Sequence, residues 1–258
     1  MNRLKSLKSL RKKLIKKELS IGSWIQIADA SVAEIIGQMG FDWVAIDMEH
    51  GAINISQLPN IFRALELGNT LPLVRIAQME EKDCKQALDA GAAGLIIPMV
   101  NDEESLSNII DYCKWPPAGK RGISFSRANL FGFKFDAYEK EAQAPLIVAM
   151  IESIEAVNNL ETILTVKGLD AIFIGPYDLS ASMGITGKFS DKRFKKTTNK
   201  ILSLSKKYNI PAGIHVVEPE KKEVNNVIKQ GYQFIACAID SVMIRNAAKY
   251  YLSFFKLR

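Results

Sequence analysis

The feature that most limits the fold of this chain is a repeated alternation of short apolar runs with amphipathic segments. Eight apolar runs are each followed by a segment with helical periodicity, often closed by glycine. Apolar runs that lack polar alternation are typical of parallel strands buried on both faces. Eight such units in 258 residues predict an α/β fold, a closed (β/α)8 TIM barrel, over an open doubly wound sheet. Residues 1–258 are interpreted as one domain of this kind.

The boundaries follow from the apolar runs and the turn residues between them. The expected strands are 20–27, 41–47, 71–76, 94–99, 146–151, 171–174, 212–216 and 234–238. The helices expected after them are 31–39, 55–67, 80–90, 103–113, 154–166, 191–208, 218–230 and 242–255. Gly68 is expected at the C′ position of its helix. Residues 114–145 break the alternation, because prolines and glycines cannot continue a helix there. We expect an irregular insertion whose aromatic residues favour an oligomer contact or lid packing over a cofactor site.

The net charge of +6 is concentrated at the N-terminus. Residues 1–19 hold eight basic side chains and one acidic one, so the rest of the chain is close to −1. Leu4, Leu7, Leu10 and Leu14 recur in this segment at helical spacing, which favours a basic N-terminal helix that plugs or flanks the barrel with its lysines in water. A helix that contacts RNA or an anionic membrane is the alternative.

Cysteine usage and hydropathy indicate the compartment. Cys84, Cys113 and Cys237 form no metal-type pair and cannot all be bridged within one chain, which indicates a reducing environment. No apolar stretch reaches the length of a signal sequence or a membrane span. We therefore expect a cytoplasmic protein without a membrane or nucleic-acid partner.

Polar side chains gather where the predicted strands end, and in a barrel these ends share one mouth. The set comprises Gln26, Asp29, Asp47, Glu49, His50, Arg75, Gln78, Glu152, Asp178, His215 and Asp240. The chain has no strand-end lysine, GxSxG elbow, GxGxxG turn after a first strand or Walker loop. These absences disfavour imine, hydrolase and nucleotide chemistry.

Glu152 and Asp178 follow neighbouring strands and could hold a hard divalent cation. Two carboxylates would leave the rest of an octahedron to water and substrate oxygens. A 2-oxo acid that chelates such a cation would have its enolate charge neutralised. The alternative is a structural network in which basic side chains cap the two acids.

Arg75 and His50 are the other candidates for chemistry. An arginine at the end of a buried strand would face an anion, either a developing enolate or an internal partner such as Asp47 or Glu49. His50 is suited to proton transfer near neutral pH, although a lone histidine is commonly a structural polar residue.

From about Gly22 to Tyr250 the chain resembles the HpcH/HpaI family of metal-dependent class II pyruvate aldolases. The matching stretches are AIDMEHG at 45–51, PLVR at 72–75, LDAGA at 88–92, IPMV at 97–100, PPAGKRG at 116–122, MIES at 150–153 and GPYDLS at 175–180. The resemblance implies a TIM barrel that forms a homohexamer built from dimers. The two subunits of each dimer would exchange a C-terminal helix, here 242–255. It also implies a divalent cation, Mg²⁺ or Mn²⁺, with Co²⁺ as a further candidate.

The same resemblance implies roles for single residues. Glu152 and Asp178 would be the metal ligands, His50 the proton-transfer residue and Arg75 the stabiliser of developing negative charge. Asp89 matches a carboxylate that raises the basicity of the histidine, and Asp47 matches a nearby acidic position. The substrate carboxylate would be held by the backbone of Gly175, Pro176, Tyr177 and Asp178.

Two positions depart from the family pattern. Met150 stands where the family usually has a glutamine that donates to the substrate, and a thioether cannot donate. Tyr177 stands where alanine is common. Both substitutions affect the substrate pocket and spare the metal ligands.

We therefore expect a lyase that cleaves a 4-hydroxy-2-oxo acid to pyruvate and an aldehyde, and joins them in reverse. His50 would assist removal of the 4-hydroxyl proton, and Arg75 and the cation would stabilise the pyruvate enolate. One alternative is another enolate reaction on the same scaffold, a citrate-lyase-like cleavage of an acyl-CoA or a decarboxylation. A second is a catalytically silent barrel that binds RNA or membrane through residues 1–19.

Overall fold

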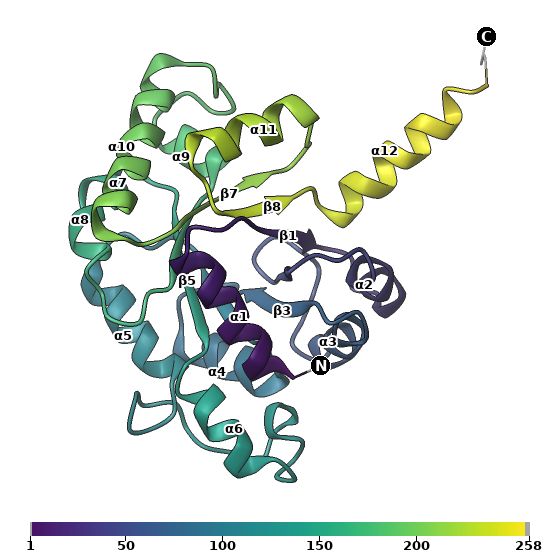
Figure 1. Ribbon diagram of the computed structural model, residues 1–258, viewed down its shortest axis with the longest axis vertical. Coiled ribbons are helices and arrows are strands. Elements are labelled where there is room, and N and C mark those ends of the chain that lie inside the picture. Colours follow the sequence, from purple (N-terminus) through teal and green to yellow (C-terminus); the bar gives the residue numbers. More distant parts are fainter. Residues whose placement is uncertain (1, 256–258) are drawn as a thin grey trace.

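The computed structural model describes residues 2–255, in which eight parallel strands close into a barrel in sequence order (Figure 1). The strands are β1 Ser20–Ile25, β2 Trp43–Asp47, β3 Leu71–Arg75, β4 Gly94–Ile97, β5 Leu146–Ile151, β6 Ala171–Ile174, β7 Ala212–Val216 and β8 Phe234–Cys237. Strand β1 pairs with both β2 and β8, which closes the sheet. The predicted (β/α)8 barrel is confirmed.

Strand register brings the polar strand ends together. Asp47, the last residue of β2, lies directly beside Arg75, the last residue of β3. Glu152 follows β5 immediately, and β6, the next strand around the barrel, leads into Asp178. The carboxyl ends of all eight parallel strands therefore present these groups at one mouth.

Helices surround the barrel and connect its strands. They are α2 Ala30–Gly37, α3 Leu58–Leu67, α4 Glu81–Ala90, α5 Glu103–Cys113, α7 Ile154–Asn158, α8 Leu160–Ile163, α9 Pro176–Ser182, α10 Lys192–Tyr208 and α11 Lys221–Gln230. A further helix, α12 Asp240–Leu252, follows the last strand. Three expectations need correction. The helix expected at 154–166 is broken into α7 and α8. The segment after β6, expected as a loop, starts with helix α9. The insertion at 114–145 contains the 3-10 helix η1 Arg127–Asn129 and helix α6 Phe135–Ala142.

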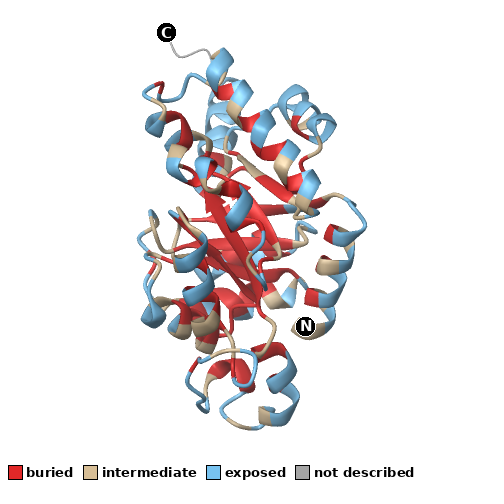
Figure 2. Ribbon diagram, turned by 90° about the vertical axis from the view of Figure 1, so that its left-hand side faces the viewer, coloured by how far each residue is buried: buried red, intermediate tan, exposed pale blue. Residues whose placement is uncertain are grey.

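Two apolar cores explain why the strands are buried on both faces. One core lies between the sheet and the surrounding helices and includes residues such as Ile46, Leu65 and Ile172. The other fills the barrel interior, where Trp43 stacks on Phe234 with 4.1 Å between ring centroids. Figure 2 shows the buried strands at the centre and helices with exposed outer surfaces around them.

Gly68 ends helix α3 for a reason different from the one expected. Its φ is −87°, so it does not adopt the left-handed C′ conformation. A Cβ at this position would lie 2.0 Å from the carbonyl oxygen of Gly37, at the end of α2. Glycine is therefore required by the close approach of α2 and α3.

The N-terminal helix α1, Arg3–Ile15, lies across the amino-terminal end of the barrel (Figure 1). Leu7, Leu10 and Leu14 are buried in the same core as the barrel interior. Leu4 is only half-buried, and Lys8 and Lys12 are exposed. The prediction of a helix that plugs the barrel is confirmed, and its lysines are exposed except Lys13, which is half-buried and pairs with Asp42.

Helix α12 extends away from the barrel (Figure 1). Several of its large apolar side chains are exposed, including Ile244, Tyr250, Tyr251 and Leu252. The exchange of this helix between subunits remains a prediction. Among residues 2–255, none of the helices combines the length and the apolar character needed to cross a membrane.

Candidate functional site

A cavity of about 290 Å³ opens at the carboxyl ends of the strands. It is lined by Trp24, Gln26, His50, Arg75, Met150, Phe173, Gly175, Pro176, Tyr177, Asp178, His215, Val217 and Ile239. Most of the residues predicted for the site therefore share one cavity. Both positions that depart from the family pattern, Met150 and Tyr177, are part of its wall.

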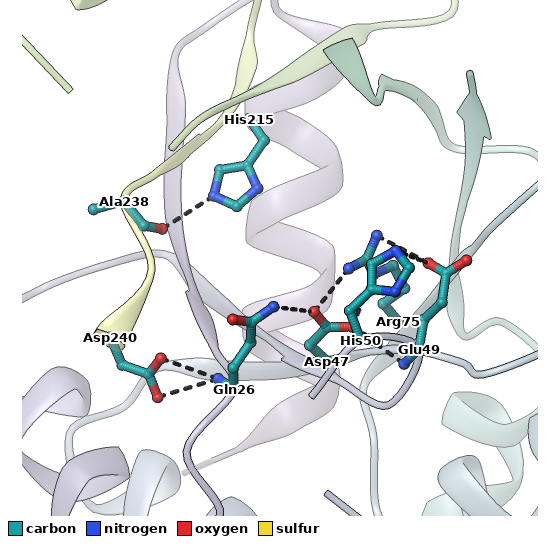
Figure 3. Close-up of polar contacts among 8 residues, drawn as sticks. All are labelled: Gln26, Asp47, Glu49, His50, Arg75, His215, Ala238 and Asp240. Atoms are coloured by element: carbon teal, nitrogen blue, oxygen red, sulfur yellow. Dashed lines mark hydrogen bonds and ion pairs between the residues drawn. The ribbon is translucent and has the colours of Figure 1, made fainter. Parts of the chain in front are cut away.

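Arg75 is held rigidly by Asp47 (Figure 3). Its Nε donates to Asp47 Oδ1 at 3.0 Å and its Nη2 to Asp47 Oδ2 at 2.7 Å, a two-point contact that fixes the guanidinium plane. Asp47 also accepts from Gln26 Nε2 at 2.8 Å and is fully buried. Burial alone would raise the pKa of Asp47, but the hydrogen bonds and charge of Arg75 outweigh it and hold that pKa below its usual range.

Asp47 also shapes the loop that carries Glu49 and His50. Its Oδ1 accepts the backbone N–H groups of both residues at 3.1 Å. Glu49 Oε2 lies 2.9 Å from Arg75 Nη1, so the arginine is flanked by two carboxylates. The His50 ring is exposed at the cavity edge, with Nε2 3.9 Å from Glu49 Oε2. Burial raises the pKa of Glu49, which the charges of Arg75 and His50 only partly offset.

Glu152 is a buried carboxylate whose negative charge is compensated by few neighbouring groups. It is 3% exposed, and its Oε1 accepts the backbone N–H of Met99 at 2.6 Å. Within residues 2–255 it forms no ion pair. Burial raises its pKa to about 7; the Met99 hydrogen bond lowers it in part, and the charges of Glu49 and Asp178 raise it further.

Asp178 reaches the same region from the first turn of α9 and is exposed. Pro176 starts this helix at a position where a missing N–H is harmless. Gly175 precedes it because a Cβ there would lie 2.6 Å from Glu152 Oε2 and displace the carboxylate. Tyr177 packs edge-on against Phe189, at 5.0 Å between ring centroids, and this contact positions the phenol at the cavity.

The donors at this mouth fit a hard divalent cation. Glu152 is buried without a cationic partner in the described residues, and Asp178 and Glu49 add negative charge close to it. Carboxylate oxygens are the ligands that Mg²⁺ and Mn²⁺ favour. No group of three or more His, Cys, Asp or Glu side chains in residues 2–255 is arranged to bind a metal by itself. The chain could therefore supply Glu152 and Asp178 and leave the remaining positions to water and substrate.

Three predicted site residues, Asp47, Glu152 and Asp89, are not among the described residues that line the cavity. Asp47 and Glu152 are buried at the mouth, whereas Asp89 lies elsewhere. It lies on helix α4, where Ser124 Oγ donates to its Oδ2 at 3.3 Å. Burial raises its pKa, and the charge of Arg121 only partly offsets this. Within residues 2–255 it accepts a hydrogen bond from Ser124 and is not paired with His50, whose ion-pair partner is Glu49.

Trp24, Gln26 and His215 contribute to the site without a role having been predicted for them. Gln26 directly follows β1 and His215 is the residue before the last of β7, so their position near strand ends was a usable signal, and Gln26 fixes Asp47. Trp24 lies under the guanidinium of Arg75, with 5.2 Å between Cζ and the ring centroid. Its inward direction depends on strand register, which no local pattern reveals.

A larger cavity of about 560 Å³ lies at the opposite end of the barrel, between α1, α10 and α11. Its lining is mainly apolar, with Lys17 and Lys206 as its charged residues. Within residues 2–255 it contains no carboxylate, histidine or cysteine.

Comparisons with known proteins match nearly the whole barrel. The profile of the HpcH/HpaI aldolase/citrate lyase family matches residues 20–247. The chain is 32% identical to a hydroxypyruvate/pyruvate aldolase of Roseobacter denitrificans, over 94% of this chain and 95% of that protein. It is 36% identical to a 4-hydroxy-2-oxovalerate aldolase of Novosphingobium aromaticivorans, over 89% and 87%. A crystal structure of an HpcH/HpaI aldolase/citrate lyase family protein from Burkholderia cenocepacia superposes with a TM-score of 0.89 at 28% identity, over 95% and 98%.

Proposed function

Because this chain belongs to the HpcH/HpaI aldolase/citrate lyase family, we propose that it is a metal-dependent class II pyruvate aldolase. It cleaves a 4-hydroxy-2-oxo acid to pyruvate and an aldehyde and catalyses the reverse addition. The observation that carries this proposal is the buried Glu152 carboxylate, which lacks a cationic partner in the described chain and lies near Asp178 and Arg75. A buried charge in that state is unfavourable until a cation compensates it.

Glu152 and Asp178 hold the cation in this proposal. Bound there, a Mg²⁺, Mn²⁺ or Co²⁺ ion would withdraw charge from the keto and carboxylate oxygens of the substrate. The backbone N–H groups at the first turn of α9 have no acceptors within the helix and face the substrate carboxylate. Met150 presents a thioether to this region and cannot donate a hydrogen bond.

Arg75 stabilises the charge that develops when the C3–C4 bond breaks. Its guanidinium lies in the cavity wall, and Asp47 prevents it from rotating. A guanidinium that is already oriented needs little reorganisation as the enolate forms. Asp47 is sealed from the cavity, so it acts as a positioning residue and not as a group that touches the substrate.

His50 takes the proton of the 4-hydroxyl group in the cleavage direction. Its imidazole is exposed at the cavity edge, where it can exchange protons with solvent. Glu49, 3.9 Å from His50 Nε2, is placed to stabilise the imidazolium that forms. The proton then becomes available for the enolate carbon, which completes pyruvate.

The oligomeric proposal rests on helix α12. Its Ile244, Tyr250 and Tyr251 are exposed large hydrophobic side chains on a helix that extends away from the barrel, and a contiguous exposed apolar surface favours a protein contact. We propose that this helix packs on a partner subunit and that dimers of this kind build a homohexamer. Sedimentation analysis of the chain and of a variant truncated before α12 measures the assembly directly.

The proposed reaction is tested by pyruvate release from a panel of 4-hydroxy-2-oxo acids, coupled to lactate dehydrogenase. The expected result is activity that a chelator abolishes and that Mg²⁺, Mn²⁺ or Co²⁺ restores. Glu152→Ala retaining full, chelator-resistant activity would refute the proposal.

A second candidate is another enolate reaction on the same scaffold, such as citrate-lyase-like cleavage of an acyl-CoA. The family name covers both activities, and Met150 and Tyr177 alter the wall of the cavity. Acyl-CoA or oxaloacetate turnover without pyruvate release from any hydroxy-oxo acid would favour it.

A further inference from the structure

His215 is a chemical group of the cavity that the proposed reaction does not use. It is the fourth residue of β7 and lines the same cavity as Arg75. Its ring stacks on the Trp24 indole, with 4.8 Å between centroids and 26° between planes. The same indole supports the guanidinium of Arg75. The imidazole is therefore held in one orientation close to the proposed reaction centre.

The hydrogen bond to Ala238 determines which ring nitrogen carries the proton. His215 Nε2 lies 3.1 Å from the carbonyl oxygen of Ala238, and a carbonyl oxygen can only accept. Nε2 must therefore be the donor. Ala238 has the left-handed φ of 61°, and its own N–H donates to the oxygen of Val216 at 2.9 Å, which fixes the carbonyl that His215 uses.

The remaining nitrogen, Nδ1, is consequently an acceptor. Burial lowers the pKa of His215 to about 4, the Ala238 hydrogen bond raises it in part, and the charge of Arg75 lowers it further, so the ring is neutral. Nδ1 has no hydrogen-bond partner in residues 2–255 and remains accessible to solvent. Figure 3 shows it on the side of the ring away from Ala238 and toward the Arg75 cluster.

The neutral acceptor Nδ1 of His215 favours a substrate that presents a hydrogen-bond donor to the cavity. Within residues 2–255 the lining of this cavity contains no lysine, and the Arg75 charge is shared between Asp47 and Glu49. Lys195 lines an adjoining cavity that also includes His215. An aldehyde that carries a carboxylate, sulfonate or phosphate and stays in the first cavity would find no free cation side chain there and would meet the lone pair of Nδ1. A hydroxyl group would instead form a hydrogen bond.

We propose that His215 is a specificity-determining residue whose Nδ1 accepts a hydroxyl group of the aldehyde half of the substrate. The preferred aldehyde is then a neutral hydroxyaldehyde and not an anionic or an unsubstituted one. This inference rests on the proposed aldolase function and names the substrate class of the same site.

The test compares the addition of pyruvate to glyceraldehyde and to propanal, which lacks the hydroxyl groups. The ratio of the two kcat/KM values is measured for the wild type, His215→Leu and His215→Gln. Intrinsic aldehyde reactivity cancels when these ratios are compared. His215→Leu removes the acceptor at similar volume and should lower the ratio about tenfold, the value of one hydrogen bond. His215→Gln offers a carbonyl oxygen and should recover part of it.

The two histidines of the chain allow a second readout that is independent of turnover. In the His50→Gln variant labelled with ¹⁵N-histidine, the single imidazole signal should be that of a neutral ring with its proton on Nε2. Glyceraldehyde should shift the Nδ1 resonance, and propanal should leave it unchanged.

Failure of this inference is distinguishable from failure of the aldolase proposal. Metal-dependent exchange of the C3 protons of pyruvate in D₂O requires no aldehyde. If the wild type exchanges but His215→Leu keeps the wild-type ratio, or glyoxylate is preferred over glyceraldehyde, the inference is overturned alone. A protonated ring or the opposite tautomer overturns it as well. A wild type without exchange refutes the aldolase proposal and this inference together.

Discussion

The two ends of the barrel handle charge in opposite ways. At the amino-terminal end, each buried or half-buried cation of α1 meets a carboxylate: Arg11 meets Asp170 at 2.7 Å and Lys13 meets Asp42 at 2.6 Å. At the carboxyl-terminal mouth, the more deeply buried Glu152 has, among the described residues, the N–H of Met99 as its one hydrogen-bond partner. The first end is arranged for stability, whereas the second keeps an uncompensated charge that a ligand can use.

The largest difference between the two ends of the barrel should appear in enzymatic activity when a carboxylate is replaced by its amide. Glu152→Gln preserves shape but removes a charge that the proposed cation needs. We expect pyruvate formation to fall at least about 10³-fold, because the stabilisation of the enolate by the cation is lost. Steady-state assays with saturating Mn²⁺ measure it. Asp170→Asn is the matched control at the other end, and its activity per folded molecule should equal that of the wild type.

The amino-terminal end should respond in stability and not in activity. Leu10 is 2% exposed and packs in the barrel interior core, so Leu10→Ala should lower the free energy of unfolding by about 3 kcal/mol. Urea titration measures this change, and the half-buried Leu4→Ala should show a smaller one. An unchanged midpoint for Leu10→Ala would mean that α1 does not close the barrel in solution.

The uncompensated charge at the mouth also predicts a pH dependence. Because the pKa of Glu152 is raised to about 7, its proton must leave before a cation binds. Mn²⁺ affinity should therefore fall about tenfold per pH unit below 7 and level off above it. The folding stability of the metal-free protein should change with pH in the opposite direction. Protonated Glu152 contributes stability at acidic pH, and this stability is lost as the pH rises through about 7. A flat affinity between about pH 5 and 8 would contradict the assignment.

The smallest effect is expected for the paired charge. Asp170→Asn leaves Arg11 with a neutral partner at a site where the two side chains are 24% and 18% exposed, and Asp170 also accepts the N–H of Ile147. We expect a loss of about 1 kcal/mol in unfolding free energy, reduced further at high salt. Metal-free Glu152→Gln, by contrast, should be more stable than the wild type at about pH 8. Destabilisation of both variants would remove the distinction between the two ends.

Most of the fold was predictable because both cores depend on local pattern. Uninterrupted apolar runs such as 146–151 located the strands, and the leucine spacing of α1 located the plug. Helix α9 was missed because Gly175-Pro176 reads as a turn, although proline is also favoured at the first helical position. The insertion at 114–145 concealed two short helices behind its prolines and glycines.

The site was predictable as a set of strand ends but not as a network. Sequence order placed Asp47 and Arg75 at adjacent strand ends, and register made them a two-point ion pair. The stacking of His215 on Trp24 joins β7 to β1, and the N–H of Met99 reaches Glu152 from the end of β4. These contacts depend on side-chain direction across strands that are distant in sequence, which residue type alone does not specify.

The central claim is that Glu152 and Asp178 hold one divalent cation for a pyruvate enolate. Its most direct test is a Mn²⁺ titration at about pH 8, in which the electron paramagnetic resonance signal of unbound Mn²⁺ is followed for the wild type, Glu152→Gln and Asp178→Asn. We predict one Mn²⁺ per wild-type chain, bound more tightly when pyruvate is present, and binding at least about 100-fold weaker in both variants. Equal Mn²⁺ binding by all three proteins would contradict the account.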